Sequence, residues 1–272
     1  MDNRPVGFFD SGLGGLTAVS ALRKLLPNEN IIYFGDTGRM PYGTRERKQL
    51  RGMARQNLEY LMSFDVKAII AACGTMSANA TDILDSCPVP VFNVLVPSVE
   101  AMSHVEGDQP LAIIATEASI RAAAFQNRLQ ELCPGREILG VPCQDFVILC
   151  ETGHISPDDE LLKKSVEGYL RPVKEKNAAA LLLGCTHFGI ISEAISDYLG
   201  RGTEILSASE CAAKRLEQYL IAENMTGGNS ESRYFTSGLE REFDALAAEI
   251  MGNEYCGHAE HVPVMTTEVE EC

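Results

Sequence analysis

The chain has 272 residues, of which 45% are hydrophobic and 22% charged, a composition typical of a globular protein with a sizeable core. Its formal net charge of −15 at pH 7 disfavours nucleic acids and anionic membranes as partners. Because no apolar run reaches the roughly 18 residues of a membrane helix, and the N-terminus lacks the plan of a signal peptide, we expect a soluble, cytoplasmic protein.

Short apolar runs alternate with longer amphipathic stretches along most of the chain, which predicts repeated strand–helix units. The expected strands are Val6–Phe9, Ile31–Phe34, Ala68–Ala72, Leu111–Ala115 and Ala178–Leu183. The expected helices are Leu16–Leu26, Glu46–Met62, Ser77–Asp85, Ile120–Leu132, Ile190–Leu199, Glu210–Asn224 and Glu240–Met251. A short apolar run at residues 234–235 precedes the last helix, and irregular chain is expected beyond Gly252. This alternation predicts an α/β fold in which helices cover both faces of parallel sheets and ligands bind at the carboxyl ends of the strands.

Two halves of the chain resemble each other. The segment from Pro5 to Ser11 is echoed by the one from Pro110 to Thr116, and each is an apolar strand that leads into a helix. Residues 67–75 are echoed by residues 179–187, where an apolar strand and a small residue again precede a cysteine. A duplicated unit would produce such matched spacings, so we predict two pseudo-symmetric, doubly wound domains.

Nine cysteines are scattered along the chain without a C-x-x-C pair, which is typical of free thiols in a reducing compartment. Cys73 and Cys185 stand where a strand gives way to a helix, and helix-start N–H groups lower a thiol pKa from about 8.5. At equivalent positions of two halves they would face each other across a cleft, as racemisation requires. One thiol would remove the α-proton and the other would protonate the opposite face. The ordinary alternative, a buried apolar residue, is assigned to Cys87, Cys133, Cys150 and Cys211.

Other loops offer candidate site residues. Asp10–Gly15 lacks the spacing of a dinucleotide or phosphate loop, so Asp10 could bind an amine, tune a thiol or simply cap the helix. Residues 35–43 and 151–154 are predicted loops, where sites are often built. No metal site is expected, because only His187 stands beside Cys185 and the Cys/His/Glu cluster at 256–261 lies in the irregular tail.

Four ordered blocks of the sequence resemble the glutamate racemases of the aspartate/glutamate racemase family, over about residues 5–251. They are Asp10–Gly15, Gly35–Thr37 with Pro41–Gly43, Ala72–Thr75 and Gly184–His187. The resemblance implies two α/β domains, residues 1–96 plus 208–272 and residues 97–207, with the active site in the cleft between them. It also implies racemisation of free glutamate without cofactor or metal, supply of D-glutamate for peptidoglycan, and a homodimer.

The same resemblance implies roles for individual residues. The catalytic group comprises two acid/base thiols and one assisting residue for each, namely Cys73, Cys185, Asp10 and His187. The supporting acidic residues are Asp36 and Glu151. The substrate-contact positions are Ser11, Pro41, Tyr42, Gly43, Gly74, Thr75, Thr116, Ser119 and Thr186.

The sequence departs from the family pattern at positions near the substrate. Gly74 stands where the family has Asn, so an amide that should hydrogen-bond the substrate is missing, and Ala122 stands where Ser is usual. An unpaired polar group of a buried substrate costs about 1–3 kcal/mol. Two alternatives therefore stay open: a racemase for aspartate or another amino acid, and a non-catalytic, racemase-like regulator.

Overall fold

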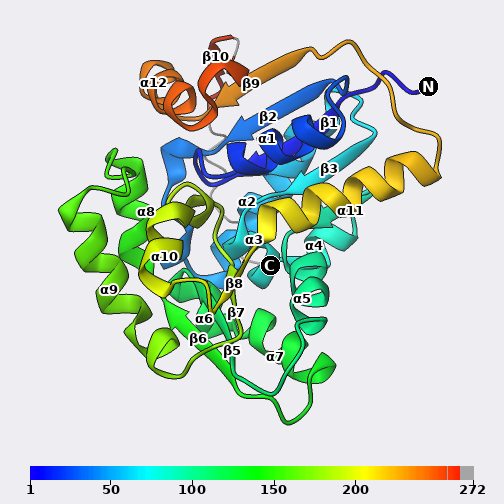
Figure 1. Cartoon of the computed structure of the whole chain (residues 1–272). Helices are drawn as coiled ribbons and strands as arrows, with labels where there is room; N and C mark the ends of the chain where they lie inside the picture. Colours follow the sequence, from blue (N-terminus) through cyan, green and yellow to red (C-terminus); the bar gives the residue numbers. More distant parts are fainter. Residues whose placement is uncertain (256, 264–272) are drawn as a thin grey trace.

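Two parallel β-sheets form the framework of the computed structural model, which describes residues 1–255 and 257–263 (Figure 1). The first sheet has the order β10-β9-β2-β1-β3-β4, with β1 Val6–Asp10, β2 Ile31–Gly35, β3 Ala68–Ala71, β4 Val91–Asn93, β9 Ser232–Thr236 and β10 Ala259–His261. The second has the order β6-β5-β7-β8, with β5 Leu111–Ala115, β6 Ile138–Pro142, β7 Ala180–Leu183 and β8 Glu204–Ser207. The predicted α/β class with two parallel sheets is confirmed.

The internal echo of the sequence is visible in the strand order. β2-β1-β3-β4 of the first sheet corresponds to β6-β5-β7-β8 of the second, so the two echoed strand pairs occupy equivalent central places. Val6 pairs with Ile31 and Ala68, and its counterpart Leu111 pairs with Ile138 and Ala180. All strands of a parallel sheet end at the same edge, so the segments after β1 and β3 meet, as do those after β5 and β7. The domain boundaries at 96/97 and 207/208 stay a prediction.

The helices connect and cover these strands. In chain order the α-helices are α1 Leu16–Leu25, α2 Arg47–Met62, α3 Gly74–Asn79, α4 Thr81–Asp85, α5 Leu95–Ser103, α6 Glu117–Ala122, α7 Ala124–Leu132, α8 Gln144–Glu151, α9 Glu160–Glu175, α10 Ser192–Leu199, α11 Ala208–Ala222 and α12 Glu240–Met251. Short 3₁₀ turns are η1 Thr37–Arg39, η2 Tyr42–Thr44, η3 Thr186–Gly189 and η4 Gly252–Glu254. The expected helix Ile120–Leu132 is two helices, because Ala123 adopts a left-handed φ of 53° that ends α6.

Several elements of the structure differ from those predicted from the sequence. The strands β4, β6 and β8 are short or only partly buried, so their apolar signal is weak. Glu151 was expected in a loop, which is wrong, because it is the last residue of α8. The irregular tail expected beyond Gly252 is also corrected, since β10 pairs with β9 in register from Ala259 to His261. Cys256, Cys272 and part of the cluster at 256–261 lie outside the described residues.

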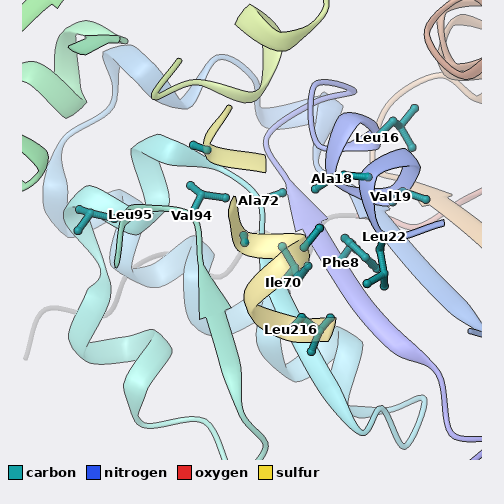
Figure 2. Packing of buried hydrophobic residues seen from close by; sticks show 14 of the residues in the cluster. Phe8, Leu16, Ala18, Val19, Leu22, Ile70, Ala72, Val94, Leu95 and Leu216 are labelled. Atoms are coloured by element: carbon teal, nitrogen blue, oxygen red, sulfur yellow. The ribbon is translucent and has the colours of Figure 1, made fainter. Parts of the chain in front are cut away.

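The strands bury side chains on both faces, which explains why they are apolar without alternation. Phe8 and Ile70 point into a core that also receives Leu22 of α1 and Leu216 of α11 (Figure 2). This same cluster continues into the second sheet through Ile113 and its neighbours. Each sheet has a separate cluster on its other face, packed by α2 to α4 in one half and α8 to α10 in the other. The two halves therefore share one core and do not merely touch.

Two sequence expectations concern surfaces and thiols. None of the helices among the described residues is long and apolar enough to cross a membrane.

Of the four cysteines expected to be buried, Cys150 is buried, whereas Cys87, Cys133 and Cys211 are only half-buried. The expectation was wrong for these three. Cys133 and Cys87 lie at the edges of hydrophobic clusters, where packing covers only one side, and Cys211 lies on α11.

Candidate active site

A small pocket lies where the carboxyl ends of the two sheets face each other. Its lining residues come from both halves and are Ser11, Pro41, Tyr42, Gly43, Cys73, Thr75, Thr116, Gln144, Val147, Cys185, Thr186 and His187. The volume open to the centres of water molecules is about 10 Å³, room for roughly one water. A larger cavity of about 630 Å³ between α1, α10 and α11 has no cysteine in its lining. The reactive side chains thus gather in the small pocket, which must open to admit an amino acid.

Cys73 caps the N-terminus of α3 directly after β3, and its side chain is buried. Its Sγ lies 3.8 Å from Oγ of Ser11, which follows the neighbouring strand β1. Burial and, after it, the nearby carboxylate of Asp10 raise the pKa of Cys73 to about 12, although the backbone N–H of Met76 lowers it. The expectation that the helix start leaves this thiol with a lowered pKa is therefore wrong, because desolvation outweighs the helix N–H.

Cys185 begins a chain of contacts that runs through His187 to the partly buried Glu151. It follows β7 and precedes the 3₁₀ turn η3, and its Sγ lies 3.7 Å from Nδ1 of His187. The other ring nitrogen, Nε2, is hydrogen-bonded to Oε1 of Glu151 at the end of α8. Burial lowers the pKa of His187, but the Glu151 carboxylate and Cys185 outweigh it, so the pKa stands well above its usual value. A positively charged imidazolium beside a sulfur can stabilise a thiolate or return a proton to it.

Asp10, the last residue of β1, is fully buried beneath the pocket. Its Oδ2 accepts hydrogen bonds from the backbone N–H of Gly15, at 2.8 Å, and from Oγ1 of Thr186, at 3.2 Å. The second oxygen, Oδ1, has no partner among the described residues. Burial raises the pKa of Asp10, although the charge of His187 and the N–H of Gly15 oppose the shift. Asp10 thus connects the two halves through its hydrogen bond with Thr186, and its hydrogen bond with Gly15 holds the glycine-rich loop that follows β1.

Tyr42 reaches the pocket with support from a buried carboxylate. Its hydroxyl donates to Oδ2 of Asp36, which also receives Nε of Arg39 at 2.6 Å. Oδ1 of Asp36 accepts from Ser237 at 2.6 Å. Asp36 is outside the pocket lining, so it acts on the site through the position of Tyr42. Pro41 and Gly43 flank this tyrosine and line the pocket directly.

A row of hydroxyls crosses from one half to the other. Oγ1 of Thr75 lies 2.9 Å from Oγ1 of Thr116, which in turn lies 3.0 Å from Oγ of Ser119. Thr116 also caps α6 by accepting from the backbone N–H of Ser119, so this residue serves both helix and pocket. Ser119 itself is buried behind Thr116 and is absent from the lining.

Gly74 occupies a junction between the halves. A Cβ atom at this position would collide with the carbonyl oxygen of Gly184, the residue before Cys185. The two cysteine-bearing loops can approach this closely only because position 74 has no side chain. Gly74 is not among the residues that line the pocket.

The structure brings most of the expected site residues together. Ten of the predicted residues line the pocket, whereas Asp10, Asp36, Gly74, Ser119 and Glu151 stand one contact away. Two lining residues, Gln144 and Val147, were missed. They lie on α8 after the edge strand β6. Because the apolar pattern of β6 is weak, the end of this strand, and with it both residues, could not be predicted from the sequence.

Comparison with known proteins places the chain among racemases. The Asp/Glu/hydantoin racemase family matches residues 17–216. A glutamate racemase from Streptococcus pneumoniae is 32% identical, with 96% of this chain and 99% of that protein covered. The crystal structure of glutamate racemase from Francisella tularensis in complex with D-glutamate superposes with a TM-score of 0.87 at 35% identity, covering 96% and 98% of the two chains. A glutamate racemase isoform from Bacillus anthracis gives a TM-score of 0.90 at 27% identity, with 97% and 99% covered.

Proposed function

Since this chain belongs to the Asp/Glu/hydantoin racemase family as a glutamate racemase, an isomerase, we propose that it interconverts L- and D-glutamate with Cys73 and Cys185 as its two acid/base groups. The observation that carries the proposal is the position of these thiols. They follow equivalent strands of two related sheets and line one pocket. No other cysteine pair among the described residues combines equivalent strand ends with a shared pocket.

In the proposed mechanism, one cysteine as thiolate takes the α-proton, and the electron pair of the C–H bond stays on the α-carbon. The thiol of the other cysteine then gives its proton to the opposite face and becomes the thiolate. The reverse reaction exchanges the two roles. His187 stabilises charge on Cys185, from which it lies 3.7 Å away. The ammonium group of the substrate favours the thiolate of Cys73, which is otherwise disfavoured by burial and by Asp10.

The remaining polar groups of the pocket fit an amino acid. Ser11, Thr75, Thr116 and Thr186 offer hydroxyls that can donate to a carboxylate or accept from an ammonium group. We propose cofactor-independent catalysis, in which the two thiols carry out both proton transfers without an electron sink or a Lewis acid. The D-glutamate so formed would serve peptidoglycan synthesis, and the proposed working unit is a homodimer.

The first experiment measures isotope exchange at the α-carbon. The purified protein is incubated with L-glutamate in D₂O with chelator and without pyridoxal phosphate, and circular dichroism and α-deuterium are followed together. Loss of optical activity with deuterium incorporation is expected. A panel that includes aspartate tests the second candidate, which the replacement of the expected Asn by Gly74 favours: turnover of aspartate without turnover of glutamate would reassign the substrate.

Replacement of either thiol tests the two-base mechanism. We expect Cys73→Ser and Cys185→Ser each to lower kcat for racemisation by about a thousandfold or more, because a serine hydroxyl is a far weaker acid than a thiol. Cys211→Ser is the control, since this cysteine lies on α11 away from the pocket, and it should keep its rate. Near wild-type racemisation by either active-site variant would rule out the mechanism.

A further inference from the structure

Gln144 is a buried glutamine whose carboxamide has no hydrogen-bond partner. It is the first residue of α8 and is 9% exposed, and neither Oε1 nor Nε2 finds a partner among the residues that the structure describes. A buried amide with both ends unpaired is costly and uncommon in a folded protein. Nothing in the packing of α8 uses these polar atoms, so a ligand is the natural partner to consider.

The carboxamide lies at the pocket that holds the two thiols. Gln144 lines this pocket together with Cys73 and Cys185. A Cβ atom built on Gly43 would lie 2.5 Å from Oε1 of Gln144 and 2.8 Å from Cβ of Thr116. The carboxamide is therefore placed between the η2 turn of one half and the start of α6 in the other. A substrate that fills the opened pocket would meet it.

Gln144 also provides an amide group, which position 74 lacks in this chain. The family pattern places an amide at position 74, but here a side chain at that position would collide with Gly184. Gly74 does not line the pocket, whereas Gln144 brings an amide into it from the other half. Its NH₂ group can donate two hydrogen bonds and its Oε1 can accept two.

We propose that Gln144 is a substrate-binding residue of this racemase, whose NH₂ group donates to a carboxylate oxygen of the amino acid. This inference rests on the proposed function for the identity of the substrate. Because the contact is made in ground state and transition state alike, its loss should act mainly on binding and KM, with a smaller effect on kcat. That division separates a binding residue from one that merely supports the fold.

The test compares the binding of glutamate to the full chain and to three variants. Gln144→Leu removes the amide at similar size, and Gln144→Glu keeps the shape but places a negative charge against the carboxylate. Gln126→Leu is the matched control, because Gln126 also has a buried, unpartnered Oε1 but lies on α7 outside the pocket. Calorimetry with DL-glutamate, already at the equilibrium ratio, avoids heat from turnover, and a melting curve verifies the fold of each variant.

We expect Gln144→Leu to raise both Kd and KM by about tenfold or more, as for a lost hydrogen bond to a charged group. Gln144→Glu should raise both constants further. Gln126→Leu should stay within about twofold of wild type. Folded Gln144 variants that bind glutamate as tightly as wild type would overturn the inference, as would failure of the wild type to bind glutamate. Wild-type deuterium exchange tests racemisation separately, so glutamate binding that depends on Gln144 without exchange would refute only the proposed function.

Discussion

At the scale of single residues, the chemistry depends on what surrounds each titratable group more than on its identity. Cys73 and Cys185 have the same side chain and equivalent strand ends, yet Cys73 lies near a carboxylate and Cys185 beside an imidazole. The partner of that imidazole, Glu151, comes from a different element, α8. Two chemically identical groups thus have different environments, which fits the proposed roles of the two thiols as opposed acid/base groups.

The Glu151–His187 pair gives a prediction about pH. Because Glu151 contributes to raising the pKa of His187, Glu151→Gln should lower that pKa. The imidazolium would then be lost at a lower pH, so the alkaline limb of the kcat/KM profile should move toward acid. A pH–rate profile of both proteins measures this shift. Glu167→Gln, an exposed change on α9, is the control, and an unmoved alkaline limb in Glu151→Gln would contradict the assignment.

At the scale of elements, α11 links the C-terminal part of the chain to the shared core. It packs on α1 and α5, and its residues Leu216 and Leu220 are fully buried. Figure 2 shows Leu216 pointing into the core. Near its start, Oγ of Ser209 lies 2.9 Å from Oγ1 of Thr17 on α1. In Figure 1 this helix, in yellow, runs beside α5 and α1, so its burial stabilises both halves together.

Shortening a side chain on the buried face of α11 should therefore destabilise the whole chain. We expect Leu216→Ala to lower the free energy of unfolding by about 2–5 kcal/mol, through lost burial and the cavity left behind. Ile221→Ala, on the same helix but 56% exposed, should change it by about 0.5 kcal/mol or less. Urea unfolding followed by circular dichroism measures both. Equal effects of the two changes on the free energy of unfolding would show that the buried face of α11 stabilises the chain no more than its exposed face.

At the scale of the whole molecule, the close approach of the two halves determines the size of the pocket. The loops after β3 and β7 meet at Gly74 and Gly184, and the enclosed pocket has room for about one water. We therefore expect the two halves to move apart when a substrate enters and to return for the proposed chemistry. The absence of a side chain at position 74 makes the closed arrangement possible.

A methyl group at position 74 should hold the halves apart. We expect Gly74→Ala to lower kcat/KM by about tenfold or more, because a collision with backbone costs about 1–3 kcal/mol and cannot be relieved by a side-chain rotation. Gly52→Ala on α2 is the matched control, since its Cβ would meet no atom within 4 Å. Kinetics and the radius of gyration from solution scattering with saturating glutamate measure the effect. Unchanged kinetics in Gly74→Ala would refute the role of this contact in closure.

The central strands of the fold and the positions of the two candidate thiols can be predicted from the sequence alone. The central strands β1, β3, β5 and β7 are apolar enough to be recognised, because burial on both faces leaves no alternation to confuse them. Their internal echo predicts that Cys73 and Cys185 stand at equivalent strand ends. The weaker edge strands, with β6 among them, were concealed because partial burial mixes polar residues into the pattern.

Only the tertiary structure decided which side chains meet at those strand ends. The contact of His187 with Glu151, the collision that a side chain at Gly74 would suffer, and the unpaired amide of Gln144 each join residues far apart in sequence. Desolvation is likewise a property of the packed molecule, and it reversed the pKa shift that the helix start predicted for Cys73. Local sequence specifies strands, helices and their ends, because these depend on neighbours along the chain, whereas burial and cross-half contacts arise only when the two sheets pack on a common core.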